Sequence, residues 1–491
     1  MLRKFAGVIS ELTVAKKKPN LHPERIGEDA NVVKETGKRL LNRTVSIELG
    51  RRSIERVADD PYCSPSPIRN MPNEILVQVF EDVIKVSISA RREDLSRGRL
   101  DVKPIRTPFH LAQVCGQWRE ILFTQPHLWS YLEFLADYSH TDERIDAEVQ
   151  RFYEARQLGR RATQSLFLPF HDIIRHEFAV YDMGSTELDP YRTIEVLAFA
   201  DEPSDLWSVP DDSAQEVILY MHGHTTHFFT PLLQAASSVT IYGVVPEWGN
   251  HLWSLLRELS IRKFHSNIPG PYFPLWISRE EFTQLLSATP FLEKLELDID
   301  RRPEVWGSNL PITHSRIESL AIHASHLTGE GSVFNVELGL PRLRELTLLS
   351  MECGWHIERS GAALTHLAPL RLIISQIKLS EVETTVELPR WQSKVEQLEL
   401  TGPNLGAVLT SINMAYNQAP STITQLPLPR LTTLHIEKTD IHGDSLLKFV
   451  REKLKHKTIG IGGVHELKGI RMYETPSVSI GEWKEIQALL D

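Results

Sequence analysis

One short pattern of residues recurs through the C-terminal part of the chain. It consists of an aliphatic residue, two variable residues, Leu or Val, one variable residue, and an aliphatic or aromatic residue. The clear copies are Ile194/Leu197/Phe199, Leu256/Leu259/Ile261, Leu292/Leu295/Leu297, Ile317/Leu320/Ile322, Leu343/Leu346/Leu348, Val395/Leu398/Leu400 and Leu431/Leu434/Ile436, with weaker copies centred on Val239, Leu372 and Ile470. The centres are 25 residues apart from Leu295 to Leu320 and 26 apart for the next three steps, with steps of 36 on either side. Such a period predicts a stack of similar units that bury one apolar row together.

A period of about 20–29 residues is typical of leucine-rich repeats, in which each unit contributes one strand and returns through a helix or an irregular segment. Glu280–Leu286 and Ser479–Ile486 suit a return helix and a final cap. The pattern therefore predicts a leucine-rich-repeat-like α/β solenoid. The Asn expected late in each repeat does not recur in the sequence, and an ordinary α/β domain whose strands contain Leu is the alternative.

In such a solenoid the aliphatic positions point inward, and the residues between them form an extended surface that suits a protein partner. Acidic residues outnumber basic ones there, which favours a target with an exposed basic stretch. The residues predicted to contact the target protein are Glu258, Arg262, Glu296, Asp298, Glu345, Glu399 and His435. The sequence does not identify that target.

The composition limits the classes of partner. A net charge of −10 repels phosphate backbones, and basic pairs such as Arg51/Arg52 and Arg301/Arg302 are scattered, so we expect no nucleic-acid partner. The three cysteines are far apart and odd in number, which excludes a disulfide framework and indicates a reducing compartment. No stretch approaches the roughly 18 apolar residues that cross a bilayer. We therefore expect a cytoplasmic or nuclear protein that makes no membrane contact.

Periodicity and composition also divide the chain into segments. Val33, Leu40, Ile47 and Ile54 recur every seven residues, which indicates a helix with one apolar seam before the prolines at 61–67. The predicted segments are a flexible tail (1–28), a helical lead-in and linker (29–65), a helical module (66–135), a connector (136–190) and the repeat domain (191–491).

The module at 66–135 has the pattern of three short helices. Pro72 fits the first position of a helix, and the apolar residues between Ile75 and Ile84 form a wide stripe. A second helix is indicated by apolar residues at spacings of three, four and three, namely Leu111, Val114, Trp118 and Ile121. A third helical turn is predicted to begin at Pro126. The charged insert Ser87–Pro108, between the first and second helices, is expected to form a surface loop. Three short helices bury little area alone, so the surplus apolar surface implies either a partner or a cap on the C-terminal region.

Several residues of the module occur in a characteristic order. They are Met71-Pro72-Asn73-Glu74-Ile75-Leu76, then Phe109-His110-Leu111-Ala112-Gln113-Val114-Cys115-Gly116-Gln117-Trp118-Arg119, then Pro126-His127-Leu128-Trp129. In this order they closely resemble the F-box family, and the lead-in Ser66-Pro67-Ile68-Arg69 looks like its large fungal expansion. The resemblance implies a three-helix module that binds the Skp-type linker protein of a cullin-containing ubiquitin ligase. The residues that match the family's linker contact are Met71, Pro72, Ile75, Leu76, Val79, Phe80, Val114, Cys115, Trp118 and Trp129.

These features predict a non-catalytic adaptor that joins a Skp-type linker and its cullin ligase core to a target protein, with no cofactor or metal. One alternative is a leucine-rich-repeat scaffold that recruits no ligase. Another is a zinc-dependent enzyme, since His222, His224 and His227 lie close together in the sequence and histidine is a common zinc ligand. No Asp, Glu or Cys lies beside them to complete a metal site, which favours a loop between strands.

Overall fold

The computed structural model describes residues 71–99, 105–133, 151, 154–155, 158–159, 165–170, 192–199, 214–222, 230–246, 248, 253–264, 275–299, 312–322, 338–349, 351–352, 367–375, 377–378, 394–402, 404–418, 426, 428–458 and 464–490. The predicted tail (1–28) and helical lead-in (29–65) lie outside these residues, as does most of the connector. The chain divides into two compact units, Met1–Pro72 and Asn73–Asp491, and the elements described below belong to the second. In the described part of the chain, no helix is both long enough and apolar enough to cross a bilayer.

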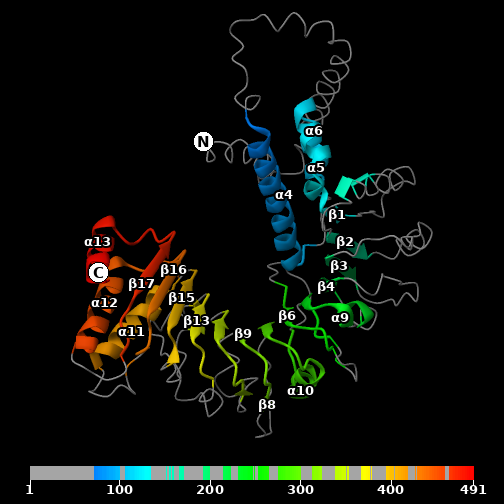
Figure 1. Cartoon of the computed structure of the whole chain (residues 1–491). Helices are drawn as coiled ribbons and strands as arrows, with labels where there is room; N and C mark the ends of the chain where they lie inside the picture. Colours follow the sequence, from blue (N-terminus) through cyan, green and yellow to red (C-terminus); the bar gives the residue numbers. More distant parts are fainter. Residues whose placement is uncertain are drawn as a thin grey trace, which may run out of the picture. The chain divides into compact units, whose positions relative to one another are not determined.

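Thirteen parallel strands of the second unit form one sheet, in which strand order follows chain order (Figure 1). They are β1 (Tyr131–Glu133), β2 (Ser165–Phe170), β3 (Thr193–Phe199), β4 (Glu216–His222), β5 (Ser238–Tyr242), β6 (Glu258–Arg262), β7 (Lys294–Asp298), β9 (Ser319–Ile322), β11 (Glu345–Leu348), β13 (Arg371–Ile374), β15 (Gln397–Thr401), β16 (Thr433–Glu437) and β17 (Gly469–Tyr473). Two further parallel pairs join β8 (Ile312–Thr313) to β10 (Leu338–Gly339) and β12 (Met351–Glu352) to β14 (Ile377–Lys378). The described residues thus form a mixed α/β structure, and its main sheet already includes two strands before residue 191.

One row of buried aliphatic residues crosses the sheet in register. Its members are Leu166, Ile194, Val217, Val239, Leu259, Leu295, Leu320, Leu346, Leu372, Leu398, Leu434 and Ile470. The strands predicted around Leu259 and from Leu295 onward are therefore confirmed. In β3, however, Ile194 lies in this aliphatic row, whereas the repeat pattern placed Leu197 there. Successive strand residues point to opposite faces, so Leu197, three residues further on, lies on the other face. We call that other side of the sheet the open face.

Helices follow some of the strands in the described part of the chain. They are α9 (Thr230–Ala235), α10 (Arg279–Ala288), α11 (Gly406–Gln418), α12 (Gly443–Thr458) and α13 (Ile480–Leu490), and the last three are grouped beside β15–β17 in Figure 1. A capping box fixes the start of α10, because the Ser278 hydroxyl accepts from the Glu281 N–H and the Glu281 carboxylate accepts from the Ser278 N–H. The predicted helices at Glu280–Leu286 and near the end of the sequence are confirmed by α10 and α13.

Among the described residues, four helical segments precede the sheet, namely α4 (Asn73–Ser96), α5 (Thr107–Ala112), α6 (Gly116–Thr124) and the 3-10 turn η4 (Pro126–Trp129). The starts at Asn73 and Pro126 agree with the sequence. The loop predicted from Ser87 is wrong as far as Ser96, because α4 continues through these residues. The second predicted helix is also corrected: Cys115 has an extended backbone, which breaks the segment into α5 and α6.

The C-terminal end of α4 packs against the open face of the sheet. Leu95 forms one buried cluster with residues of β2, β3, β4 and β5, namely Phe167, Leu197, Ile218, Tyr220 and Tyr242. These residues lie on the side of the sheet opposite the aliphatic row, since their positions are one or three residues beyond it. Strands β2–β5 are thus covered on both faces, and the open face becomes accessible only from β6 onward.

Candidate protein-binding surfaces

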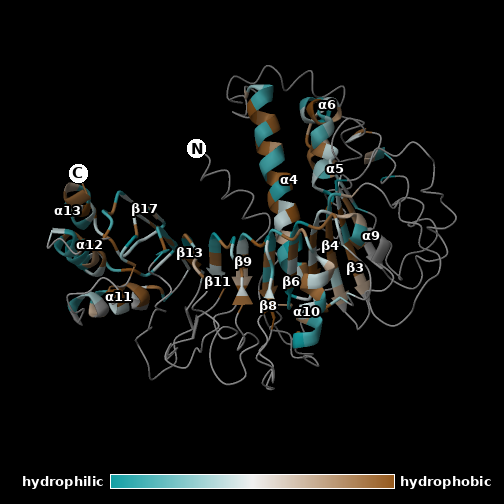
Figure 2. Cartoon of the chain, turned by 60° about the horizontal axis from the view of Figure 1, so that its bottom comes forward, coloured by the Kyte–Doolittle hydropathy of each residue, from teal (hydrophilic) through white to brown (hydrophobic). Residues whose placement is uncertain are grey.

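Helix α4 has two apolar stripes that lie side by side. Leu76, Phe80 and Ile84 are buried. The second stripe, which we call the outer stripe, consists of Ile75, Val79, Val83 and Val86. At about 100° per residue these four positions fall within about 80° of the helix circumference. Ile75 is 43 % exposed and Val86 67 % exposed, and the hydrophobic bands along α4 are visible in Figure 2. The outer stripe is an apolar surface that the described part of the chain leaves open.

Aromatic contacts hold the buried stripe inside the module. The Phe80 and Trp118 rings meet edge to face with their centroids 4.8 Å apart. Trp129 is buried, its indole Nε1 donates to the Leu122 carbonyl oxygen at 2.9 Å, and its ring centroid lies 5.0 Å from that of Phe109. Of the ten residues matched to the F-box linker contact, Leu76, Phe80 and Trp129 are therefore covered by the chain itself, where they fix the positions of the helices.

The remaining matched residues are accessible to different degrees. Pro72, Ile75, Val114 and Cys115 are exposed, whereas Met71, Val79 and Trp118 are half-buried. Val114 and Cys115 lie in the break between α5 and α6, where Cys115 occupies the N-cap position of α6 without a capping hydrogen bond from its side chain. The bend thus presents the Val114 side chain, which is 59 % exposed, at the surface rather than on a helix face.

Two ion pairs with buried carboxylates tie α4 to the sheet. Arg91 pairs with Glu133 of β1, and its guanidinium carbon lies 5.1 Å from the centroid of the Phe167 ring. Arg92 pairs with Glu195 of β3, whose carboxylate is fully buried. Burial raises the pKa of Glu195 above its ordinary value, and the hydrogen bond from Arg92 works against that rise. The C-terminal end of α4 is therefore fixed on strands β1–β5, and the outer stripe lies towards its N-terminal end.

The open face from β6 onward begins with a connected polar group. Arg262 donates to the Glu296 carboxylate at 2.6 Å and to the Tyr242 hydroxyl at 3.0 Å. The Ser260 hydroxyl donates to the same carboxylate at 2.9 Å. Burial is the largest single influence on the pKa of Arg262 and tends to lower it, but the hydrogen bonds and charge interactions with Glu296 and Tyr242 together outweigh burial, and the net pKa is raised. Lys294 pairs with Glu258 at 2.5 Å.

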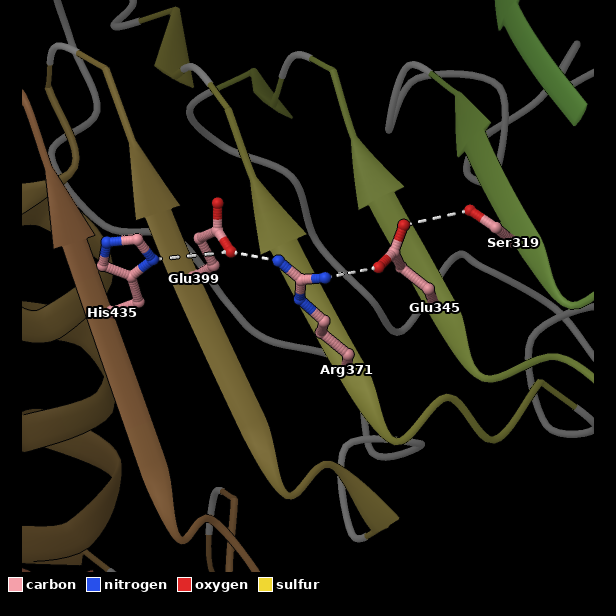
Figure 3. Close-up of polar contacts among 5 residues, drawn as sticks. All are labelled: Ser319, Glu345, Arg371, Glu399 and His435. Atoms are coloured by element: carbon pink, nitrogen blue, oxygen red, sulfur yellow. Dashed lines mark hydrogen bonds and ion pairs between the residues drawn. The ribbon is translucent and has the colours of Figure 1, made fainter. Parts of the chain in front are cut away.

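A second polar row crosses strands β9 to β16 (Figure 3). The Ser319 hydroxyl donates to Glu345 at 3.0 Å, and Arg371 bridges two carboxylates, donating to Glu345 at 2.8 Å and to Glu399 at 2.5 Å. His435 Nδ1 lies 3.6 Å from Glu399. The hydrogen bond with Glu399 is the largest cause of the raised pKa of Arg371. The row is a network across five neighbouring strands in which one guanidinium serves two carboxylates.

Arg371 was not among the residues predicted for this surface. It belongs to the weak repeat centred on Leu372, and stepping 26 residues from Glu345 would have found it, because the two residues are register partners. Each predicted acidic residue among Glu258, Glu296, Glu345 and Glu399 has a basic partner on the same face. The local pairing reduces the acidic excess on which the expectation of a basic target rested.

The chain of contacts through Arg371 is partly exposed, so its contribution to stability should be small. We expect Arg371→Met to lower the free energy of unfolding by about 0.5–1 kcal/mol. A double-mutant cycle with Glu399→Gln should give a coupling energy of similar size that falls as salt is added. Arg344→Met is the control, because the Arg344 side chain is 73 % exposed and its guanidinium lies 3.9 Å from the Glu318 carboxylate. Equal losses of unfolding free energy in Arg371→Met and Arg344→Met would mean that the network adds nothing to stability.

The three histidines considered for zinc cannot be assembled into a site from the described residues. His222 is the last residue of β4, while His224 and His227 lie outside those residues. The described residues contain no group of three or more His, Cys, Asp or Glu side chains arranged to hold a metal ion. No protein-family model and no curated protein matches the sequence. The features that bear on function are therefore the residues matched to the F-box motif, the outer stripe of α4 and the open face of the sheet.

Proposed function

We propose that this protein is a substrate-recognition adaptor of a cullin-type ubiquitin ligase. In this proposal α4, α5–α6 and η4 form an F-box-like module that binds a Skp-type linker protein. The strands from β1 onward, with their return segments, form a leucine-rich-repeat-like solenoid that binds the target. The protein acts by holding two partners together and performs no chemistry itself.

The observation that carries the proposal is the outer stripe of α4. It begins beside the Met71-Pro72 motif and contains Ile75 and Val79, two of the residues that match the F-box linker contact. Two of its four aliphatic residues are exposed and two are half-buried, although the adjacent stripe is buried. Apolar anchors that become desolvated at an interface usually carry most of the binding energy. A helical partner surface would complete the burial that the module lacks.

The ion pairs at the other end of α4 support an adaptor role. Because Arg91 and Arg92 pair with carboxylates of β1 and β3, these ion pairs connect the proposed linker-binding helix directly to the proposed target-binding sheet. A ligase adaptor needs such a connection, since a bound target has to be held at a reproducible distance from the ligase core. The open face from β6 onward supplies the paired charges and hydroxyls of a polar protein interface.

The outer stripe can be tested by placing charge on it. We expect Ile75→Glu/Val86→Glu to lower retention of the Skp-type linker by about tenfold or more, because a carboxylate pressed into an apolar contact costs more than about 1.4 kcal/mol. Retention is measured by co-purification of linker and cullin with the tagged chain. Both positions are exposed, so the fold should survive, which circular dichroism can verify.

Lys85→Glu is the matched control, because it changes the net charge by the same amount on the polar side of α4, where Lys85 is exposed. This variant should retain the linker. If the intact chain retains neither linker nor cullin, the scaffold alternative replaces the adaptor proposal. If both variants retain the linker as the intact chain does, the outer stripe is not the binding surface.

A further inference from the structure

The segments that lead into several strands share one turn. A hydrogen bond joins the N–H of Leu292, Leu343 or Leu431 to the carbonyl oxygen three residues earlier, on Thr289, Leu340 or Leu428. In each case proline is the second residue of the turn, where its fixed φ is favourable. The fourth residue is buried and lies three residues before the aliphatic row. The third residue of each turn is therefore held at the same rim of the sheet, at the point where the parallel strands begin.

From β9 onward this rim carries more basic than acidic residues. Arg316, Arg342, Lys394 and Arg430 lie four residues before the aliphatic row of β9, β11, β15 and β16. Arg344 and Lys468 lie two residues before that row in β11 and β17. All of these side chains are exposed. We call the six residues the basic rim.

Few acidic groups neutralise the basic rim. Glu318, Glu396 and Glu466 lie beside it, so six positive charges face three negative ones, in a chain whose net charge is −10. Glu466 is already paired with Lys457 at 2.6 Å, and Glu318 is 3.9 Å from Arg344. Among the described residues, neither Arg342 nor Arg430 has an ion pair. The fold thus concentrates positive charge that looks scattered in the sequence.

The dimensions of the rim indicate what it could bind. Strands β9, β11, β13, β15, β16 and β17 are consecutive neighbours in the sheet. At about 4.8 Å per strand, the rim extends over about 24 Å, which matches about seven residues of an extended peptide. Guanidinium groups recognise carboxylates through paired hydrogen bonds. A long polyanion such as a nucleic acid would also meet the net negative charge of the rest of the chain.

We propose that the basic rim binds an acidic segment of a partner protein. The surface is separate from the outer stripe of α4 and from the open face, so the inference is independent of the ligase proposal. Binding would be electrostatic and would weaken as salt is added, because the cations are exposed and their interactions are screened.

A labelled glutamate peptide of about eight residues provides a direct probe of the full chain. Fluorescence anisotropy should show binding that weakens between about 50 and about 200 mM NaCl. We expect Arg342→Glu/Arg430→Glu to weaken it by about tenfold or more, and Arg342→Gln/Arg430→Gln to weaken it less, since reversal adds repulsion to the loss of attraction. A lysine peptide of equal length should not bind.

Lys448→Glu/Lys484→Glu is the matched control, because it reverses two exposed charges on α12 and α13 and changes the net charge equally. It should bind the glutamate peptide like the wild type. Equal weakening in both double variants, or no binding by the wild type, would overturn the proposal. Tighter rim-dependent binding of single-stranded oligothymidylate than of the glutamate peptide would also overturn it, in favour of a nucleic-acid ligand.

Discussion

Replacing Arg91 by methionine is expected to lower the free energy of unfolding by about 3–5 kcal/mol, the usual cost of removing one partner of a buried ion pair. The Arg91 and Glu133 side chains are only 2 % and 5 % exposed, so the substitution leaves a buried carboxylate without its guanidinium. It also removes the contact between Arg91 and the Phe167 ring. Denaturant unfolding followed by tryptophan fluorescence and circular dichroism measures the loss.

The double variant Arg91→Met/Glu133→Gln separates the buried charge from the packing. Glutamine at 133 still offers an oxygen to the Ile105 N–H, which donates to the Glu133 carboxylate at 2.5 Å. Removing both charges of a buried pair is often close to neutral, so the double variant should recover most of the lost stability. A single variant that loses less than about 1 kcal/mol would mean that α4 is not anchored by this pair.

The parts of the fold that can be predicted from the sequence are those determined by residues close together in the chain. The aliphatic row is predictable from Leu259 onward because the open face there is polar, so burial of one face leaves an alternating pattern. The start of α4 after Pro72 and of η4 at Pro126 follows from the place of proline in the first turn of a helix. The exposure of Ile75 beside the buried Leu76 follows from a stripe wider than one partner helix can cover.

The unpredicted features depend on residues far apart in the sequence. Residues 87–96 appear as a charged insert, but Arg92 finds its carboxylate partner 103 residues away in β3. Because α4 covers the open face at β2–β5, β4 is apolar on both faces and loses the alternating pattern over Val217–Met221. In β3, Val196 and Leu197 are both apolar, so the repeat pattern fits Leu197 although Ile194 lies in the aliphatic row. The basic rim is likewise absent from any local sequence pattern, since only the strand register aligns Arg316 with Arg342.

The stability of the protein is expected to depend on pH through Lys453 of α12. This side chain is 1 % exposed, and its Nζ donates to the carbonyl oxygens of Leu428 and Pro429, both at 2.9 Å. Burial lowers the pKa of Lys453 from 10.5 to about 7. Between about pH 7 and 10.5 the unfolded chain therefore holds a proton that the folded chain has released, and stability rises with pH across this window.

A comparison with Lys453→Met isolates this effect. Between about pH 6 and 10, the wild type should gain about 3–5 kcal/mol of unfolding free energy relative to the variant, which follows from the pKa difference at about 1.36 kcal/mol per unit. Lys448→Met, at an exposed position of the same helix, should keep the pH dependence of the wild type. If the unfolding free energies of the wild type and Lys453→Met change with pH in parallel, Lys453 keeps its proton on folding and the two carbonyl oxygens hold it as an ammonium. The two pH profiles diverge only where the folded protein has lost a proton that the unfolded chain retains.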